Sequence, residues 1–311
     1  MITSMTTKHS PAQTAAKTSA ELKATIDKEL RFEPFDFESF EVQGITVKAK
    51  HFSFAPCIHM EVGFRYGAIH DEAGKEGTAH FLEHMIFDGS SMFADEKETQ
   101  EFGKTVMLDT LNAYTGMFEL FVTGKCLPHN FNTALQGVFS MIIEPKLTKK
   151  SWDHEQKVIT QEAWGKFLNE KRVAYIRKER ENTMFDIPDR LRMASAIGWP
   201  ETILQITHDD IVNAHKTYFI KENMEIYIAG NIDAIGGMDA LKHALDEILI
   251  KMPSAKNSGG RAREPFIPKR IGNPKKPIFD HTYEEIGLST RQQSSLSLST
   301  ILPRIDKKAE Q

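Results

Sequence analysis

Two histidines and a glutamate stand close together in the stretch AHFLEHMIFDGS, residues 79–90. His80 and His84 are four residues apart, so a helix would place both imidazoles on one face, one turn apart. Two imidazoles in that arrangement can converge on one metal ion. Glu83 lies beside the same face, where its carboxylate could reach a metal-bound water without binding the metal. These residue types therefore indicate a metal site that can carry out hydrolysis.

A structural interpretation competes with this one. An isolated pair of histidines four residues apart is more typical of a half-buried pair, with Glu83 as a salt-bridge partner. Three features favour the metal site. The glutamate occupies the position that hydrolysis requires, Phe81 and Leu82 beside it supply the apolar wall that a metal site needs, and a second carboxylate pattern follows downstream. Catalytic zinc keeps three protein ligands and leaves a fourth position for water. A third ligand must therefore come from elsewhere in the chain.

A second carboxylate pattern lies downstream, in HEQKVITQEAWGK at residues 154–166. Glu155 and Glu162 are seven residues apart, so two helical turns place them on one face. A second helix packed against the first could direct Glu162 toward the metal. Glu155 could then fix a histidine through its other ring nitrogen. Taken alone, two acids at this spacing are more typical of a solvated helix face.

The elements that must position these residues can be predicted from apolar periodicity. Strands are predicted at residues 37–50 (a hairpin around Gly44), 57–68, 112–126 and 223–233. Helices are predicted at residues 77–87, 130–145, 148–171, 207–219 and 236–252, with Thr78 and Thr207 as N-caps and Gly89 as a stop. The pattern lacks a clean alternation of strand and helix. It therefore favours an α+β fold, an antiparallel sheet with helices packed on it.

Composition excludes several classes of protein. With 40% hydrophobic and 26% charged residues, the chain of 311 residues can bury a sizeable core. A net charge of -4 gives no general case for a nucleic-acid partner or an anionic membrane. No apolar run reaches the length of a membrane span. Cys57 and Cys126 are the only cysteines, too few for a disulfide-stapled scaffold or a cysteine-rich zinc site.

The chain divides into three predicted regions. Residues 1–32 are polar, lack the apolar core of a secretory signal, and are predicted to be a disordered leader. Residues 33–252 are predicted to form the metal-bearing domain. Residues 253–311 are rich in Pro, Ser and basic side chains and are interpreted as an extended tail, or as an arm that docks on a partner or on its own domain. The cytoplasm is the expected compartment, with mitochondrial-type targeting left open.

The block GKEGTAHFLEHMIFDGS at residues 74–90 resembles the zinc motif of the pitrilysin or insulinase family of metallopeptidases, which includes the mitochondrial processing peptidases. Its order of residues, H-x-x-E-H, is that of the inverted zincins. The resemblance implies one zinc ion per chain, held by two histidines and a distant glutamate. It assigns zinc binding to His80, His84 and Glu162, catalysis to Glu83, and orientation of a ligand to Glu155.

Two other segments carry the same resemblance, which covers residues from about 35 to 250. Residues 208–233 are similar to the helix and strand that close the family's first domain. LNAYTG at residues 111–116 is similar to the Asn-Ala-x-Thr segment that lines the family's substrate cleft. The residues implied to contact substrate are Asn112, Ala113 and Thr115.

The chain also departs from the family pattern. Gly103 lies further from Asn112 than the corresponding glycine usually does, so a loop is longer here, and Gly116 replaces a small polar residue. Family members are built from paired homologous domains that enclose a chamber. This sequence contains the metal-bearing copy and shows no second one. A homodimer, or a heterodimer with a homologous half that lacks zinc, is therefore the expected assembly.

The resemblance implies a zinc-dependent metalloendopeptidase that hydrolyses unfolded peptides, with Glu83 activating the water. Two other interpretations were weighed. One is a non-catalytic subunit that binds peptide or supports a paired assembly. The other is a lyase similar to S-ribosylhomocysteine lyase, whose comparable helix is completed by a cysteine in a much shorter chain. The presence of Glu155 and Glu162 argues against the lyase.

Overall fold

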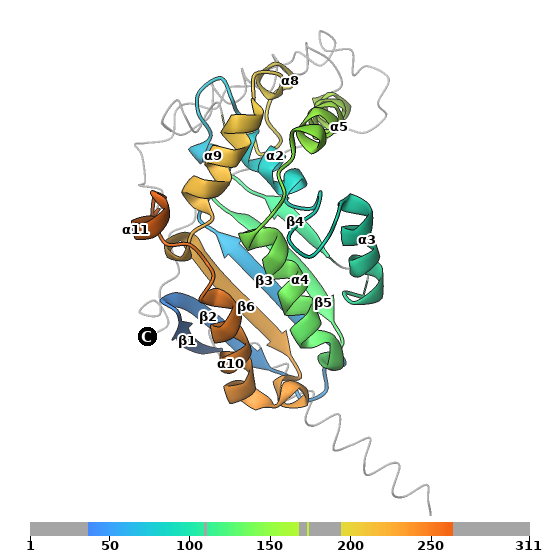
Figure 1. Cartoon of the computed structure of the whole chain (residues 1–311), viewed down its shortest axis with the longest axis vertical. Coiled ribbons are helices and arrows are strands. Elements are labelled where there is room, and N and C mark those ends of the chain that lie inside the picture. The colour runs from blue at the N-terminus through green and yellow to red at the C-terminus, as the bar shows by residue number, and fades with distance from the viewer. Residues whose placement is uncertain (1–36, 109–110, 168–172, 174–193, 264–311) are drawn as a thin grey trace, which may run out of the picture.

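The computed structural model describes residues 37–108, 111–167, 173 and 194–263. The predicted leader, the tail beyond Arg263 and the end of the helix predicted at 148–171 lie outside these residues. The described part folds into one six-stranded sheet with helices packed against it (Figure 1). The predicted α+β class is confirmed.

The first two strands, β1 (Glu38–Val42) and β2 (Ile45–His51), form the predicted hairpin. Its turn consists of Gln43, with φ 52°, and Gly44, with φ 76°. A two-residue hairpin turn with positive φ at both positions matches the right-handed twist of the strands. Glycine at the second position lowers the cost of that conformation.

The remaining strands are β3 (Ile58–Phe64), β4 (Asn112–Thr115), β5 (Leu120–Cys126) and β6 (Met224–Gly230). They lie in the order β1-β2-β6-β3-β5-β4, and every neighbouring pair is antiparallel except β2 and β6, which are parallel. The expectation of an antiparallel sheet is therefore wrong for this pair. A parallel pair needs a long crossover connection, and the many residues between β2 and β6 provide it.

The single strand predicted at residues 112–126 is also wrong in detail. A turn after Thr115 divides it into β4 and β5, which pair as a hairpin. The backbone N–H of Gly116 donates a hydrogen bond to the carbonyl of Glu119 at 2.7 Å, which closes the turn. β4 thereby becomes the last strand at one edge of the sheet.

The α-helices are α2 (Thr78–Met85), α3 (Glu96–Thr105), α4 (Phe131–Ile143), α5 (Lys149–Phe167), α8 (Pro200–Ile203), α9 (His208–Tyr218), α10 (Gly237–Leu249) and α11 (Ala255–Ser258). Short 3-10 helices are η1 (Ala68–His70), η2 (Pro128–Asn130), η3 (Lys221–Asn223) and η4 (Ile232–Ile235). The sequence analysis missed α3, which contains Gly103 and ends just before the segment that leads to Asn112. Asp95 caps α3 by accepting a hydrogen bond from the N–H of Glu98 at 3.1 Å.

The two predicted N-caps have different outcomes. Thr207 caps α9, because its hydroxyl accepts from the N–H of Asp210 while the Asp210 carboxylate accepts from the N–H of Thr207. Thr78 does not cap α2. The N-cap is Gly77, at φ 109°, and the Thr78 hydroxyl instead donates to the Lys75 carbonyl at 2.7 Å. The first turn of α2 thus has no side-chain cap of its own.

The core lies between the sheet and the helices. One row of buried residues crosses five strands, because the register aligns Val47, Ile226, Val62, Val122 and Ala113. In Figure 1, α4 and α10 lie across the sheet, whereas α2, α5, α8 and α9 gather at its upper end. Within the described residues, no helix combines the length and apolar character needed to cross a membrane.

The first part of the predicted tail packs against its own domain. After α11, the N–H of Arg261 donates to the Thr217 carbonyl at 2.9 Å. Asn223 is fully buried; its amide donates to the Arg261 carbonyl at 2.9 Å, and its side-chain oxygen accepts from the N–H of Arg263 at 2.7 Å. Residues 253–263 therefore form part of the folded domain.

Candidate metal centre

The side chains that the sequence singled out come from α2 and α5, which pack against each other. One ligand atom from each of His80, His84 and Glu162 lies within 4.8 Å of the other two. Glu162 Oε2 is 3.9 Å from Nε2 of His80 and 3.6 Å from Nε2 of His84. Two helices far apart in the sequence thus direct three groups toward one point.

These residues fit a zinc ion by chemistry and by spacing. Imidazole nitrogen and carboxylate oxygen are both common zinc ligands, and ligands placed tetrahedrally at about 2.1 Å from zinc lie about 3.4 Å apart. The two measured separations from Glu162 are only slightly longer. The half-exposed Glu162 also leaves the site open to solvent on one side. A small adjustment of this side chain would complete a three-ligand site.

Glu155 holds the second histidine in place. Its Oε2 atom lies 2.8 Å from Nδ1 of His84, and its side chain is only 8% exposed. When Nδ1 is bonded to a carboxylate, the other ring nitrogen is left to face the metal. The structure thus brings Glu155 to the position that the resemblance implies.

The two histidines have different electrostatic surroundings. Burial, reinforced by the charges of His84 and Lys166, lowers the pKa of His80 to about 3, which keeps its ring in the neutral form that binds metals. Burial alone would lower the pKa of His84 as well. The hydrogen bond and charge of Glu155, with the charges of Glu83 and Glu162, outweigh burial and raise the pKa of His84.

Glu83 lies next to the converging groups and bonds with Thr115. The Thr115 hydroxyl donates to Glu83 Oε2 at 2.5 Å. Burial raises the pKa of Glu83 although the Thr115 hydrogen bond opposes it. A carboxylate whose pKa is raised toward neutrality is suited to accept and return a proton. Sequence analysis predicted that Thr115 contacts substrate, and in the structure its hydroxyl contacts Glu83.

The segment predicted to contact substrate lies at the edge of the sheet beside α2. β4 pairs with β5 on one side, and no described strand pairs with its other side. Asn112 is exposed, Ala113 is buried in the core row, and Thr115 faces Glu83. A free strand edge beside the candidate metal ligands can pair with the backbone of an extended peptide.

Asp71 is a further residue at this site that sequence analysis missed. It is almost fully buried, and its carboxylate accepts hydrogen bonds from backbone N–H groups at the start of α2. Burial raises the pKa of Asp71 to about 7, although those hydrogen bonds lower it. The sequence offered only an acidic residue shortly before the helix as a signal, because Thr78 was predicted to supply the N-cap.

Comparison with protein families agrees with this geometry. The model of the insulinase family, peptidase family M16, matches residues 48–188. An insulinase-family domain is thus recognised in this part of the chain. The predicted resemblance is confirmed, and family membership supports a peptidase role.

Relatives of this chain include an uncharacterized zinc protease of Rickettsia bellii, 26% identical over 200 residues that cover 63% of this chain and 47% of the relative. A probable mitochondrial-processing peptidase subunit beta of Arabidopsis thaliana is 29% identical over 159 residues, which cover 50% of this chain and 28% of that protein. The chain thus spans half or less of the length of these relatives.

A solved structure supports the fold. A protease from Helicobacter pylori matches with a TM-score of 0.62 at 19% sequence identity. The match covers 78% of this chain and 55% of that one. The sheet and helices described above therefore share the fold of that structure.

Proposed function

We propose that this chain is the metal-bearing part of a zinc-dependent metalloendopeptidase that hydrolyses unfolded peptides. The observation that carries the proposal is the convergence of His80, His84 and Glu162 within 4.8 Å, with Glu83 beside them, in an insulinase-family domain. A structural pair of histidines would not require a third group from a separate helix. It would also leave the half-buried, hydrogen-bonded Glu83 without a purpose.

Each side chain has one proposed task. His80, His84 and Glu162 would hold the ion. When bound, zinc lowers the pKa of a water molecule and polarises the scissile carbonyl. Glu83 takes the proton from the attacking water and later returns it to the leaving amine. The Thr115 hydroxyl holds the Glu83 carboxylate in the orientation that this transfer needs.

The proposed substrate is an extended peptide added to the outer edge of β4. Backbone hydrogen bonds would align it alongside Asn112, Ala113 and Thr115, so that its scissile bond lies next to α2. Such pairing depends on the backbone rather than on side chains. The site would therefore accept many sequences but only unfolded segments.

A second, homologous half is proposed to complete the active unit, either a partner that lacks zinc or another copy of this chain. The chain spans half or less of the length of its first relatives, and one of these is named as a subunit beta. Such a half could come from a homologous partner in a heterodimer or from a second copy of this chain. The same observation favours the alternative function, a non-catalytic subunit that binds peptide.

The test is cleavage of an internally quenched, unstructured peptide by the purified full chain with one equivalent of zinc. Wild type should cleave, and Glu83→Gln should keep its zinc while losing about 100- to 10,000-fold in rate. Glu247→Gln, on the exposed surface of α10, is the matched control and should cleave like wild type. The measurement is repeated with a homologous second half added.

The outcomes separate the two functions. Cleavage that Glu83→Gln abolishes supports the peptidase. Peptide binding without cleavage, both alone and with the second half present, would instead establish the non-catalytic subunit.

A further inference from the structure

The helix that carries both candidate histidines begins without a cap of its own. Its N-cap is Gly77, which has no side chain to accept a hydrogen bond. The first backbone N–H groups of any helix have no partner within that helix. In α2 these groups precede His80 directly, so an unrestrained first turn would move the imidazole.

His80 depends on this turn more than His84 does. The ring of His84 is held by Glu155 at its Nδ1 atom. The Nδ1 atom of His80 is buried and has no hydrogen-bond partner among the described residues. The direction of the His80 ring is therefore set by packing and by the backbone of α2.

Asp71 supplies the missing cap from outside the helix. Its Oδ2 atom accepts from the N–H of Gly77 at 2.8 Å, and its Oδ1 atom accepts from the N–H of Ala79 at 3.0 Å. Ala79 immediately precedes His80. A carboxylate at this end of a helix also interacts favourably with the helix dipole.

Asp71 is supported by the aromatic side chain of Tyr66, which in turn packs on Tyr218. The Tyr66 hydroxyl donates to Asp71 Oδ1 at 3.3 Å. The Tyr66 ring stacks on Tyr218, with ring centroids 4.2 Å apart and planes 11° apart, and Tyr66 is fully buried. Arg263 donates to the Tyr218 hydroxyl at 2.9 Å. The carboxylate therefore has a rigid support rather than a mobile surface position.

The loop between Asp71 and α2 is fixed separately. Lys75 forms an ion pair with Asp210 of α9 at 2.5 Å, and the Thr202 hydroxyl donates to the Glu76 carbonyl at 2.7 Å. These contacts hold the loop but do not satisfy the N–H groups of Gly77 and Ala79. Asp71 alone, among the described side chains, reaches both of them.

We propose that Asp71 is a positioning residue for the metal site. It fixes the first turn of α2 and thereby directs His80 toward His84 and Glu162. This inference rests on the metal site of the proposed function, and it concerns zinc affinity rather than peptide cleavage.

The test measures the zinc dissociation constant by competition with a chromophoric chelator. In Asp71→Asn the shape is kept, but the new NH2 group must face one of the two N–H donors. We expect zinc binding to weaken about 10- to 100-fold, as for other groups that orient a ligand. The visible spectrum of the cobalt-substituted chain should change as well, because the coordination geometry changes.

Leu245→Ala is the control for a general loss of stability. Leu245 is buried on α10, away from α2, so its truncation should lower the melting temperature while leaving the zinc affinity and the cobalt spectrum unchanged. If Asp71→Asn does not fold, Tyr66→Phe is measured instead. This change removes only the hydroxyl that donates to Asp71. We expect it to weaken zinc binding several-fold.

The inference is overturned if Asp71→Asn, or Tyr66→Phe in its place, binds zinc as tightly as wild type. It is also overturned if the wild type binds no zinc. A wild type that binds zinc without cleaving any peptide refutes the proposed peptidase, but the affinities of the variants still decide the role of Asp71.

Discussion

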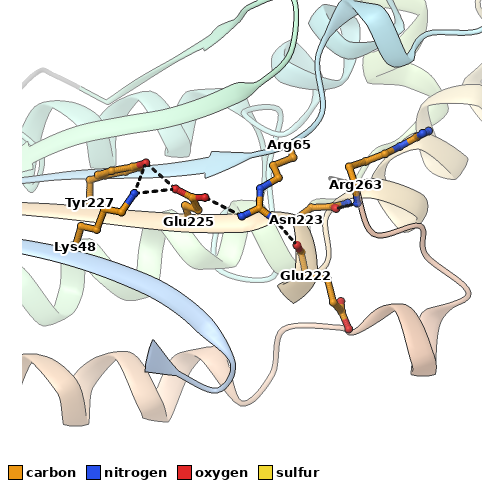
Figure 2. A network of polar contacts seen from close by, with 7 residues as sticks. All are labelled: Lys48, Arg65, Glu222, Asn223, Glu225, Tyr227 and Arg263. Carbon is orange, nitrogen blue, oxygen red and sulfur yellow. Dashed lines mark hydrogen bonds and ion pairs between the residues drawn. The ribbon is translucent and has the colours of Figure 1, made fainter. Parts of the chain in front are cut away.

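The candidate metal centre and the polar network around Glu225 differ in the charged partners that surround their carboxylates. In the network, shown in Figure 2, Glu225 is 2.8 Å from Arg65 and 3.3 Å from Lys48, and Tyr227 donates to it at 2.7 Å. Burial alone would raise the pKa of Glu225, but these partners outweigh it and lower the pKa. The negative charge of Glu225 is thus balanced by the lysine and the arginine of the same network.

In the part of the chain that the structure describes, no lysine or arginine forms an ion pair with a carboxylate of the candidate metal centre. Among the described residues, the ion-pair partners of Glu155 and Glu162 are histidines, and Glu83 is hydrogen-bonded to the neutral Thr115. Burial raises the pKa of Glu83. Three carboxylates beside two imidazoles leave a surplus of negative charge that a divalent cation would balance. The contrast supports the proposal that the candidate metal centre binds a cation, whereas the Glu225 network is balanced by its own side chains.

Removing the ligand from α5 should break the metal centre most severely. We expect Glu162→Gln to weaken zinc binding by at least about 100-fold, the upper range for loss of a group that only orients a ligand. The dissociation constant is measured by chelator competition. Glu225→Gln is the matched control and should bind zinc like wild type; equal affinity in the two variants would refute the assignment of Glu162.

Zinc should stabilise the fold through the metal centre alone. At a free zinc concentration 100 times the dissociation constant, the free energy of unfolding should rise by about 2.7 kcal/mol. Thermal unfolding with zinc and with excess chelator measures this difference. Glu162→Gln should show almost none of it at the same zinc concentration, and an equal shift in that variant would place the ion elsewhere.

Loss of the orienting carboxylate should have a smaller effect than loss of a ligand. We expect Glu155→Gln to weaken zinc binding about 10- to 100-fold, because His84 keeps its position but loses the fixed orientation of its ring. The same competition assay measures it. An unchanged affinity would mean that the 2.8 Å contact with His84 has no part in metal binding.

The smallest effect is expected in the network. Glu225→Gln should lower the free energy of unfolding by less than about 1 kcal/mol, because the ion pairs are partly exposed. The folded pKa of Glu225 is lowered from 4.5, so its contribution is present above that pH and is lost as pH falls through the folded pKa. Unfolding curves of wild type and Glu225→Gln should therefore converge below about pH 4.5. A difference that grows in acid would contradict the lowered pKa.

The part of the metal centre carried by α2 could be predicted from sequence because it is local. His80, Glu83 and His84 share one helix, so their spacing determines their common face. Glu162 was different, because spacing alone favoured a solvated helix face and only the family resemblance implied a ligand. Its position depends on how α5 packs against α2, which no local pattern specifies.

Features that depend on tertiary contacts could not be predicted from the sequence. The Thr115 hydroxyl reaches Glu83 only because β4 lies beside α2, and Asp71 reaches Ala79 only through the fold of the intervening loop. The division of residues 112–126 into two strands was missed because apolar alternation continues on both sides of the turn. The predicted hairpin at Gly44 succeeded because its two turn residues and its alternation lie within one short segment.

The position of β6 determines when the sheet can be completed during synthesis on the ribosome. β6 lies between β2 and β3, although it is made long after both of them. The metal-bearing helix and α5 therefore emerge while the two halves of the sheet are still separate. Until Met224–Gly230 is available, β2 and β3 expose unpaired edges, which are prone to pair with other chains. Nascent chains shorter than this point would need protection, and contacts across such a long separation slow folding.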